Sequence, residues 1–173
     1  IKEKPQASYQ YIHARFHPDT FDEFWEEWGN KQNDAIGSIL YRLGELEINQ
    51  KRSILKTSDH FRIVNKLVKY LSSIEYWHDQ DSGIWEMDEE IHSSSVGACV
   101  AGLKSIARVA HIEVPISLIR KGEKALNELL PRESERKFTD LALLSLIWPY
   151  DVVNQEQRNS ILENVEYHLR RKR

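Results

Sequence analysis

Apolar residues recur at helical spacing in six stretches of this 173-residue chain, and no stretch shows the convincing period-2 alternation of a strand. The six stretches begin near Asn33, Ser58, Ile91, Pro115, Leu141 and Asn154. The third and fifth are apolar around much of their circumference, whereas the second, fourth and sixth are apolar along one stripe only. The sequence therefore predicts an all-α fold in which inner and outer helices form two layers.

Short connections make successive helices antiparallel, so the first, third and fifth helices should point the same way. The loops before these three helices then gather at one end of the layer; they span residues 28–33, 77–92 and 131–138. Trp28, Trp77 and Trp85 lie in these loops together with several carboxylates. Helix N-termini also favour anionic or hydroxyl-rich groups. We expect a binding site at this end, and the alternative is that aromatic loops merely plug the end of the helical layer.

The second of these loops places an aromatic ring beside a carboxylate. Asp81-Ser82-Gly83 is a turn signal that delivers Trp85 directly before Glu86, and the serine run 93–95 that follows can cap a helix. An indole offers an apolar wall to a sugar face and can desolvate a carboxyl, which raises its pKa for acid chemistry. Taken alone, such a pair is only weak support for catalysis.

The composition limits the classes of partner and the cellular compartment that we expect for this chain. The net charge of -3 is not that of a nucleic-acid-binding surface, and no apolar run approaches the roughly 20 residues that a membrane span needs. The single cysteine, Cys99, permits no internal disulfide and gives no zinc-ligand spacing. We therefore expect a cytoplasmic domain with no metal and no cofactor. The chain begins at Ile1 without an initiator Met or a signal peptide, which we interpret as a trimmed, processed or partial chain.

Four motifs occur in a specific order along the chain. They read Trp-Gly-Asn-Lys-Gln-Asn-Asp-Ala at 28–35, Gly-Ile-Trp-Glu at 83–86, His-Ser-Ser-Ser-Val-Gly at 92–97, and Leu-Leu-Pro-Arg-Glu-Ser at 129–134 followed by Thr-Asp-Leu-Ala-Leu-Leu at 139–144. With these motifs, over residues 13–170, the chain resembles the glucoamylase family (glycoside hydrolase family 15). The serine run and the Pro-Arg-Glu-Ser run are particularly similar to the glucoamylase-like domain of the phosphorylase kinase alpha and beta subunits.

This resemblance implies a fold and a set of site residues. The family fold is an (α/α)6 toroid of twelve helices, so the six helices expected here would form about half of a single toroid domain that includes residues 1–173. Glu86 lies at the position where the enzymes of this family have their general acid. The resemblance further assigns substrate contacts to Trp28, Gln32, Asp34 and Trp85.

Two departures from the family pattern also stand out. Asn30 occupies the position of a sugar-binding arginine, and Met87 occupies the position of a second glutamate in the fungal enzymes. The family segments that supply an arginine clamp and the general base are absent from this chain.

The sequence is therefore compatible with three functions. The first is an inverting glycosidase that acts on α-glucosides, and the second is an inactive carbohydrate-binding or regulatory module. The third is a purely structural helical scaffold. The expected ligand is an oligosaccharide or glucan. Because half a ring leaves one edge bare, we also expect either a homodimer or a longer chain that closes the ring.

Overall fold

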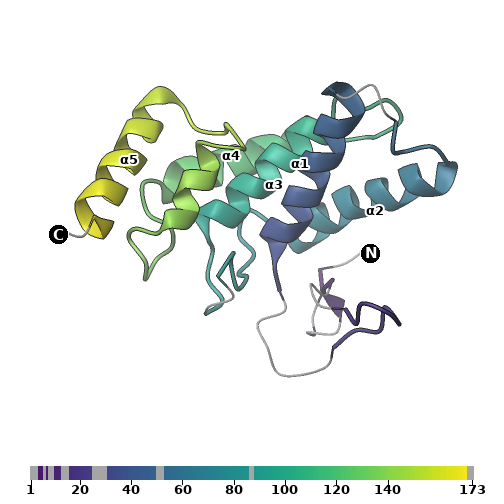
Figure 1. The fold of residues 1–173 in the computed structure, drawn as a ribbon, viewed down its shortest axis with the longest axis horizontal. Coiled ribbons are helices and arrows are strands. Elements are labelled where there is room, and N and C mark those ends of the chain that lie inside the picture. Colours follow the sequence, from purple (N-terminus) through teal and green to yellow (C-terminus); the bar gives the residue numbers. More distant parts are fainter. Residues whose placement is uncertain are drawn as a thin grey trace.

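Helices are the regular secondary structure of the part of the chain that its computed structural model describes, which is residues 4–5, 7, 10–12, 16–24, 31–49, 53–85 and 88–170. The helices of these residues are α1 (Asn33–Asn49), α2 (Ser58–Ile74), α3 (Ser93–Ile106), α4 (Ile116–Leu129), the 3-10 helix η2 (Leu141–Leu146) and α5 (Gln155–Leu169) (Figure 1). Residue pairs 16–23 and 81–90 form isolated bridges, and these described ranges contain no strand. The all-α prediction is confirmed.

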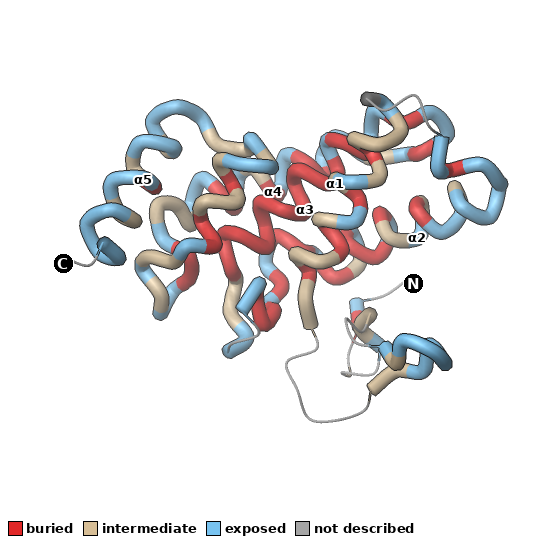
Figure 2. The backbone as a smooth tube through the Cα atoms, viewed as in Figure 1, coloured by how far each residue is buried: buried red, intermediate tan, exposed pale blue. Residues whose placement is uncertain are grey.

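Helix α3 is the centre of the core. It lies between α1 and α4, and all of its residues except Lys104 are buried (Figure 2). Small residues allow α1 and α3 to approach at backbone distance: a Cβ atom on Gly102 would lie 2.4 Å from the carbonyl oxygen of Gly37. This packing on two sides agrees with the sequence of the third helix, which is apolar around much of its circumference.

The helix starts follow the capping rules with small shifts. The cap of α2 is Thr57 rather than Ser58, because the Thr57 hydroxyl accepts the backbone N–H of His60. Asn154, near which the sixth apolar stretch begins, caps α5 in a reciprocal capping box with Gln157.

The fifth predicted helix is present, but it is a short 3-10 helix and it is not buried on every side. Residues 141–146 form a 3-10 helix, in which Leu143 donates to the carbonyl of Asp140. The stretch between the cap at Asp140 and the turn at Pro149 is short, and short stretches favour the tighter i→i+3 pattern. Its burial is also one-sided, since Leu143 is fully buried while Leu141 is 53% exposed.

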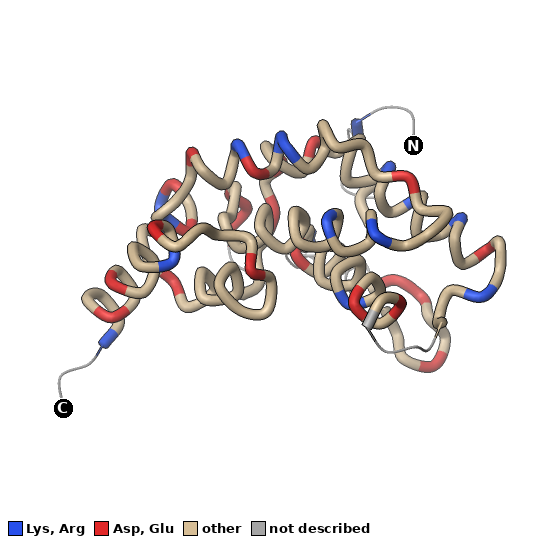
Figure 3. Tube along the Cα trace, turned by 90° about the horizontal axis from the view of Figure 1, so that it is seen from above, with Lys and Arg blue, Asp and Glu red and all other residues tan. Residues whose placement is uncertain are grey.

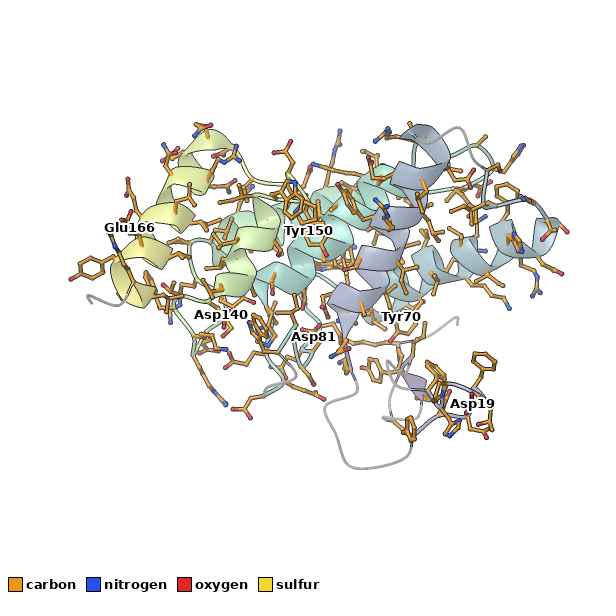
Figure 4. All side chains as sticks on the ribbon, in the orientation of Figure 1. Asp19, Tyr70, Asp81, Asp140, Tyr150 and Glu166 are labelled. Carbon is orange, nitrogen blue, oxygen red and sulfur yellow. The ribbon has the colours of Figure 1, made fainter. Side chains whose placement is uncertain are left out.

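The starts of α1, α3 and η2 lie at the same end of the molecule, where Asp81 and Asp140 are labelled in Figure 4. Backbone hydrogen bonds join them: Ser82 donates to the carbonyl of Lys31, and Ser93 donates to the carbonyl of Glu133. The predicted helix polarity is therefore confirmed for the described residues.

The surface of the described helices is mixed in charge. Lys and Arg positions alternate with Asp and Glu positions along the backbone of the helices (Figure 3). Of the helices that the structure describes, none combines the length and the apolar composition that a membrane span requires.

Candidate functional site

The loop of residues 82–89, here the 82–89 loop, is closed at its base by backbone pairing. Asp81 donates its N–H to the carbonyl of Glu90 at 2.9 Å, and Glu90 donates back at 3.0 Å. Gly83 has a φ of +63°, a conformation that glycine adopts without strain, and a Cβ there would lie 2.9 Å from the ring of His92. The predicted turn is therefore present. Residues 86 and 87 lie outside the described residues.

Two buried carboxylates attach this loop to the start of α1. Asp81 Oδ2 accepts the backbone N–H of Asn33 at 2.9 Å. Asp79 accepts from the Asn33 side-chain amide and from Lys31 Nζ, each at 2.9 Å. The Lys31 and Asp79 side chains are only 14% and 3% exposed. The sequence analysis named Asp81 only as part of a turn and gave neither aspartate a contact to α1, although two carboxylates at a two-residue spacing before a turn would point to one side of an extended segment.

The serine run after the loop has a different role from the one predicted. The cap of α3 is His92, which makes no side-chain cap bond. Ser93 Oγ instead donates to the carbonyl of Arg132 at 2.6 Å, and Ser94 Oγ donates to Glu133 Oε1 at 2.5 Å. The loop before η2 presents the acceptors of both hydrogen bonds. These two serines therefore join the start of α3 to that loop.

A buried group of ionisable side chains lies behind these contacts. Burial raises the pKa of Asp34, and it raises the pKa of Asp81 to about 7 although the Asn33 N–H and the Ser95 hydroxyl oppose the shift. Burial alone would lower the pKa of His92, but the carboxylates of Glu133 and Asp81 raise it overall. The pKa values of Asp34, Asp81 and His92 are therefore all raised at this end of the helical layer.

One oxygen of each of three carboxyls in this group is buried without a hydrogen-bond partner among the described residues. These atoms are Oδ1 of Asp34, Oδ1 of Asp81 and Oε2 of Glu133. Burial without a hydrogen bond is consistent with the raised pKa values of the two aspartates, Asp34 and Asp81.

Asp140 connects the tip of the 82–89 loop to η2. Its Oδ1 accepts the indole N–H of Trp85 at 2.7 Å and the backbone N–H of Ala142 at 2.9 Å, while Oδ2 accepts from Lys137 Nζ at 2.9 Å. Partial burial would raise the pKa of Asp140, but these three donors lower it overall. The carboxylate is therefore ionised, and Trp85 remains 56% exposed. A small cleft lies next to this contact, lined by Ser82, Trp85, His92, Glu133, Lys137 and Asp140 among others.

The predicted site residues fall into two groups. Gln32 and Asp34 lie at the start of α1 and are half-buried, and Trp85 lies on the loop that Asp79 and Asp81 attach to the same helix start. Trp28 and Glu86 lie outside the described residues, so their places at this end stay predictions.

One further tryptophan of these loops proves to be a core residue. Trp77 is buried beside Tyr76, with Lys121 Nζ 4.3 Å from its ring centroid. It is therefore not part of an open site.

Comparison with known proteins gives one matching family model and several relatives. The model of glycosyl hydrolases family 15 matches residues 3–165. The probable phosphorylase b kinase regulatory subunit alpha of Caenorhabditis elegans is 28% identical over 138 residues, covering 70% of this chain and 11% of that protein. The skeletal muscle isoform of phosphorylase b kinase regulatory subunit alpha from Oryctolagus cuniculus is 27% identical over 161 residues, covering 82% of this chain and 13% of that protein.

The probable phosphorylase b kinase regulatory subunit alpha of Drosophila melanogaster is also 27% identical over 164 residues, covering 82% of this chain and 13% of that protein. The chain thus spans only 11–13% of the length of these curated relatives. The family match, in contrast, extends over nearly the whole chain. The chain therefore belongs to glycosyl hydrolases family 15.

Proposed function

We propose that the three loops form part of an α-glucoside-binding site in which Glu86 is the general acid of an inverting hydrolysis. The observation that carries this proposal is the state of Trp85, the residue directly before Glu86. Its indole N–H is held by Asp140 at 2.7 Å while the side chain stays 56% exposed. A ring that is fixed at its edge and open to solvent is suited to stack on a sugar.

In this reaction Glu86 would protonate the glycosidic oxygen while a second carboxylate activates a water on the other face of the sugar. The two carboxyls of inverting enzymes lie roughly 6.5–9.5 Å apart. The apolar indole beside Glu86 would desolvate its carboxyl and keep it protonated at neutral pH. Trp28, Gln32 and Asp34 are the proposed sugar contacts on the α1 side. We assign the general base to no residue of this chain.

A second candidate is a sugar-binding module that regulates and does not hydrolyse. The similarity to proteins named as regulatory subunits of phosphorylase b kinase favours it. In this case the same loops would bind a glucan, and Trp85 would matter for binding while Glu86 would not. A cytoplasmic location belongs to both proposals, and the free, buried Cys99 supports it.

The deciding experiment measures glucose release from maltotetraose by the complete protein and by its Glu86→Gln variant. Loss of the acid should reduce the rate by about 10²–10⁴-fold. Glu89→Gln is the matched control, because Glu89 is an exposed carboxylate of the same loop, and it should leave the rate unchanged. Equal rates for the wild type and Glu86→Gln would remove Glu86 from the mechanism.

Calorimetry with the same oligosaccharide separates the two candidates. Binding without glucose release, abolished by Trp85→Ala and unaffected by Glu86→Gln, would support the regulatory module. Release of the β-anomer, seen by NMR at early times, would support the inverting hydrolase.

A further inference from the structure

We propose that Asp140 is the positioning residue of the Trp85 indole and, through it, of the loop that carries Glu86. This proposal rests on the proposed sugar site, and it names the residue that gives that site its geometry. Asp140 lies 55 positions from Trp85 in the sequence and contributes through a side chain that the substrate need not touch.

The 82–89 loop is firmly held at its base. The backbone pairing of Asp81 with Glu90, the Asp81 contact to α1 and the Ser82 contact to Lys31 fix its two ends. On the side of the tip that precedes Glu86, residues 83–85 make one described hydrogen bond to another segment, the bond from Trp85 to Asp140. The orientation of this part of the loop therefore depends on Asp140.

Asp140 is itself held in place before any ligand arrives. It is the cap of η2 with an extended backbone, and its side chain is 13% exposed. The N–H of Ala142 and the ammonium of Lys137 fix both carboxylate oxygens, at 2.9 Å each. A fixed, ionised acceptor makes a stronger hydrogen bond to an indole N–H than a neutral or mobile one.

This geometry leaves the ring available to a ligand. The bond uses the edge of the indole, and more than half of the Trp85 side chain stays exposed. Asp140 therefore sets the plane of the ring without covering it. A rotated indole ring would alter sugar stacking. Because Trp85 directly precedes Glu86 in the chain, it would also shift the backbone at which the acid residue begins, and small displacements of a catalytic group lower the rate strongly.

The test is a double-substitution cycle in the complete protein with maltotetraose. Asp140→Ala and Trp85→Phe each remove the bond, and each should raise KM and lower kcat so that kcat/KM falls by about tenfold to a hundredfold, the range for a hydrogen bond to a charged group. The double variant should be no worse than the poorer single variant, because both substitutions remove one interaction. Asp140→Asn should recover part of the loss, since its amide oxygen can still accept from the indole.

Asn154→Ala is the control for the capping role of Asp140, because it removes the cap of α5, and the described hydrogen bond of the Asn154 side chain is to the N–H of Gln157. Its kcat and KM should match the wild type. Losses that multiply in the double variant, or an Asp140→Asn variant as impaired as Asp140→Ala, would overturn the positioning role.

Hydrogen exchange of the peptide covering residues 82–91 provides a readout that does not depend on turnover. Exchange should be faster in Asp140→Ala and Trp85→Phe, and unchanged in Asn154→Ala. If the wild type releases no glucose, the hydrolase proposal fails while the exchange still decides the positioning. If the wild type is active and neither exchange nor kcat/KM changes in the variants, the positioning role is wrong and the hydrolase stands.

Discussion

His92 and Glu133 form a buried pair in which Nδ1 and Oε1 lie 3.5 Å apart, with side chains 7% and 3% exposed. Glu133 Oε1 also accepts the hydroxyl of Ser94 at 2.5 Å. The pair joins the start of α3 to the loop before η2, which are distant in the sequence. Because a buried charge without its partner is costly, this contact constrains how the loop before η2 lies on α3.

Glu133→Ala should therefore destabilise the protein strongly. Removal of one member of a buried pair costs about 3–5 kcal/mol, because the other charge is left without compensation. Glu133→Gln should cost less, since its amide oxygen still accepts from Ser94. The free energy of unfolding in urea measures both, and Glu135→Ala, an exposed neighbour, should stay within about 0.5 kcal/mol of the wild type. A Glu133→Ala variant as stable as Glu135→Ala would show that the pair contributes little.

Asp81 should make stability fall as pH rises. Its folded pKa of about 7 lies above the ordinary value of 3.8, so the folded state binds the proton more tightly than the unfolded state. This contribution is fully present below about pH 4 and is lost as pH rises through 7, with a limiting slope of about 1.4 kcal/mol per pH unit for one proton. The raised pKa of His92 acts in the same direction.

Asp81→Asn isolates this effect, because its amide oxygen can still accept the Asn33 N–H while the titrating group is gone. Thermal unfolding between pH 4.5 and 8 should show a shallower pH dependence in this variant. Part of the His92 contribution should also disappear, since Asp81 is one of the charges that raise the pKa of His92. Asp88→Asn, on an exposed position of the same loop, should keep the wild-type slope. Identical slopes in all three proteins would contradict the buried, protonated Asp81.

The local features of the fold were predictable from the sequence, and the long-range contacts of the site were not. The start of α1 at Asn33 and the cap of α5 at Asn154 follow from apolar periodicity and capping chemistry, which are properties of neighbouring residues. The bond between Trp85 and Asp140 joins segments 55 residues apart, and periodicity carries no information about such a pairing. The serine run was predicted to cap a helix for the same reason, because the hydrogen-bond partners of Ser93 and Ser94 are Arg132 and Glu133, which are distant in the sequence.

Gly102→Ala should destabilise the contact between α1 and α3. The added methyl group would lie 2.4 Å from the carbonyl oxygen of Gly37, so the helices would have to separate. Overpacking of this kind typically costs about 1–3 kcal/mol. Lys104→Ala, on the same helix and exposed, is the control and should change the free energy of unfolding by less than about 0.5 kcal/mol. If Gly102→Ala is tolerated as well as Lys104→Ala, the close approach of the two helices is wrong.

In the half-ring interpretation, apolar side chains at one edge of the helical layer are left uncovered. The expected bare edge does not lie on α3, which α1 and α4 cover. Large exposed apolar residues occur on several segments of the described chain; three of them are Ile39 on α1 (52% exposed), Leu141 on η2 (53%) and Trp148 in the turn after η2 (80%). Soluble monomers rarely leave apolar patches beyond a few hundred Å² in water, since about 25 cal/mol per Å² is gained by covering them.

We therefore expect the 173-residue chain, studied on its own, to self-associate in sedimentation experiments or to bind a hydrophobic dye, because a second copy or further helices of the toroid would normally cover this surface. Substitution of Leu141 and Trp148 by serine should reduce both effects. Tyr167→Ser on α5, where the side chain is 83% exposed, is the matched control and should not. A stable, well-folded monomer that binds no dye would contradict the half-toroid interpretation, because half a ring has an uncovered edge and a complete domain does not.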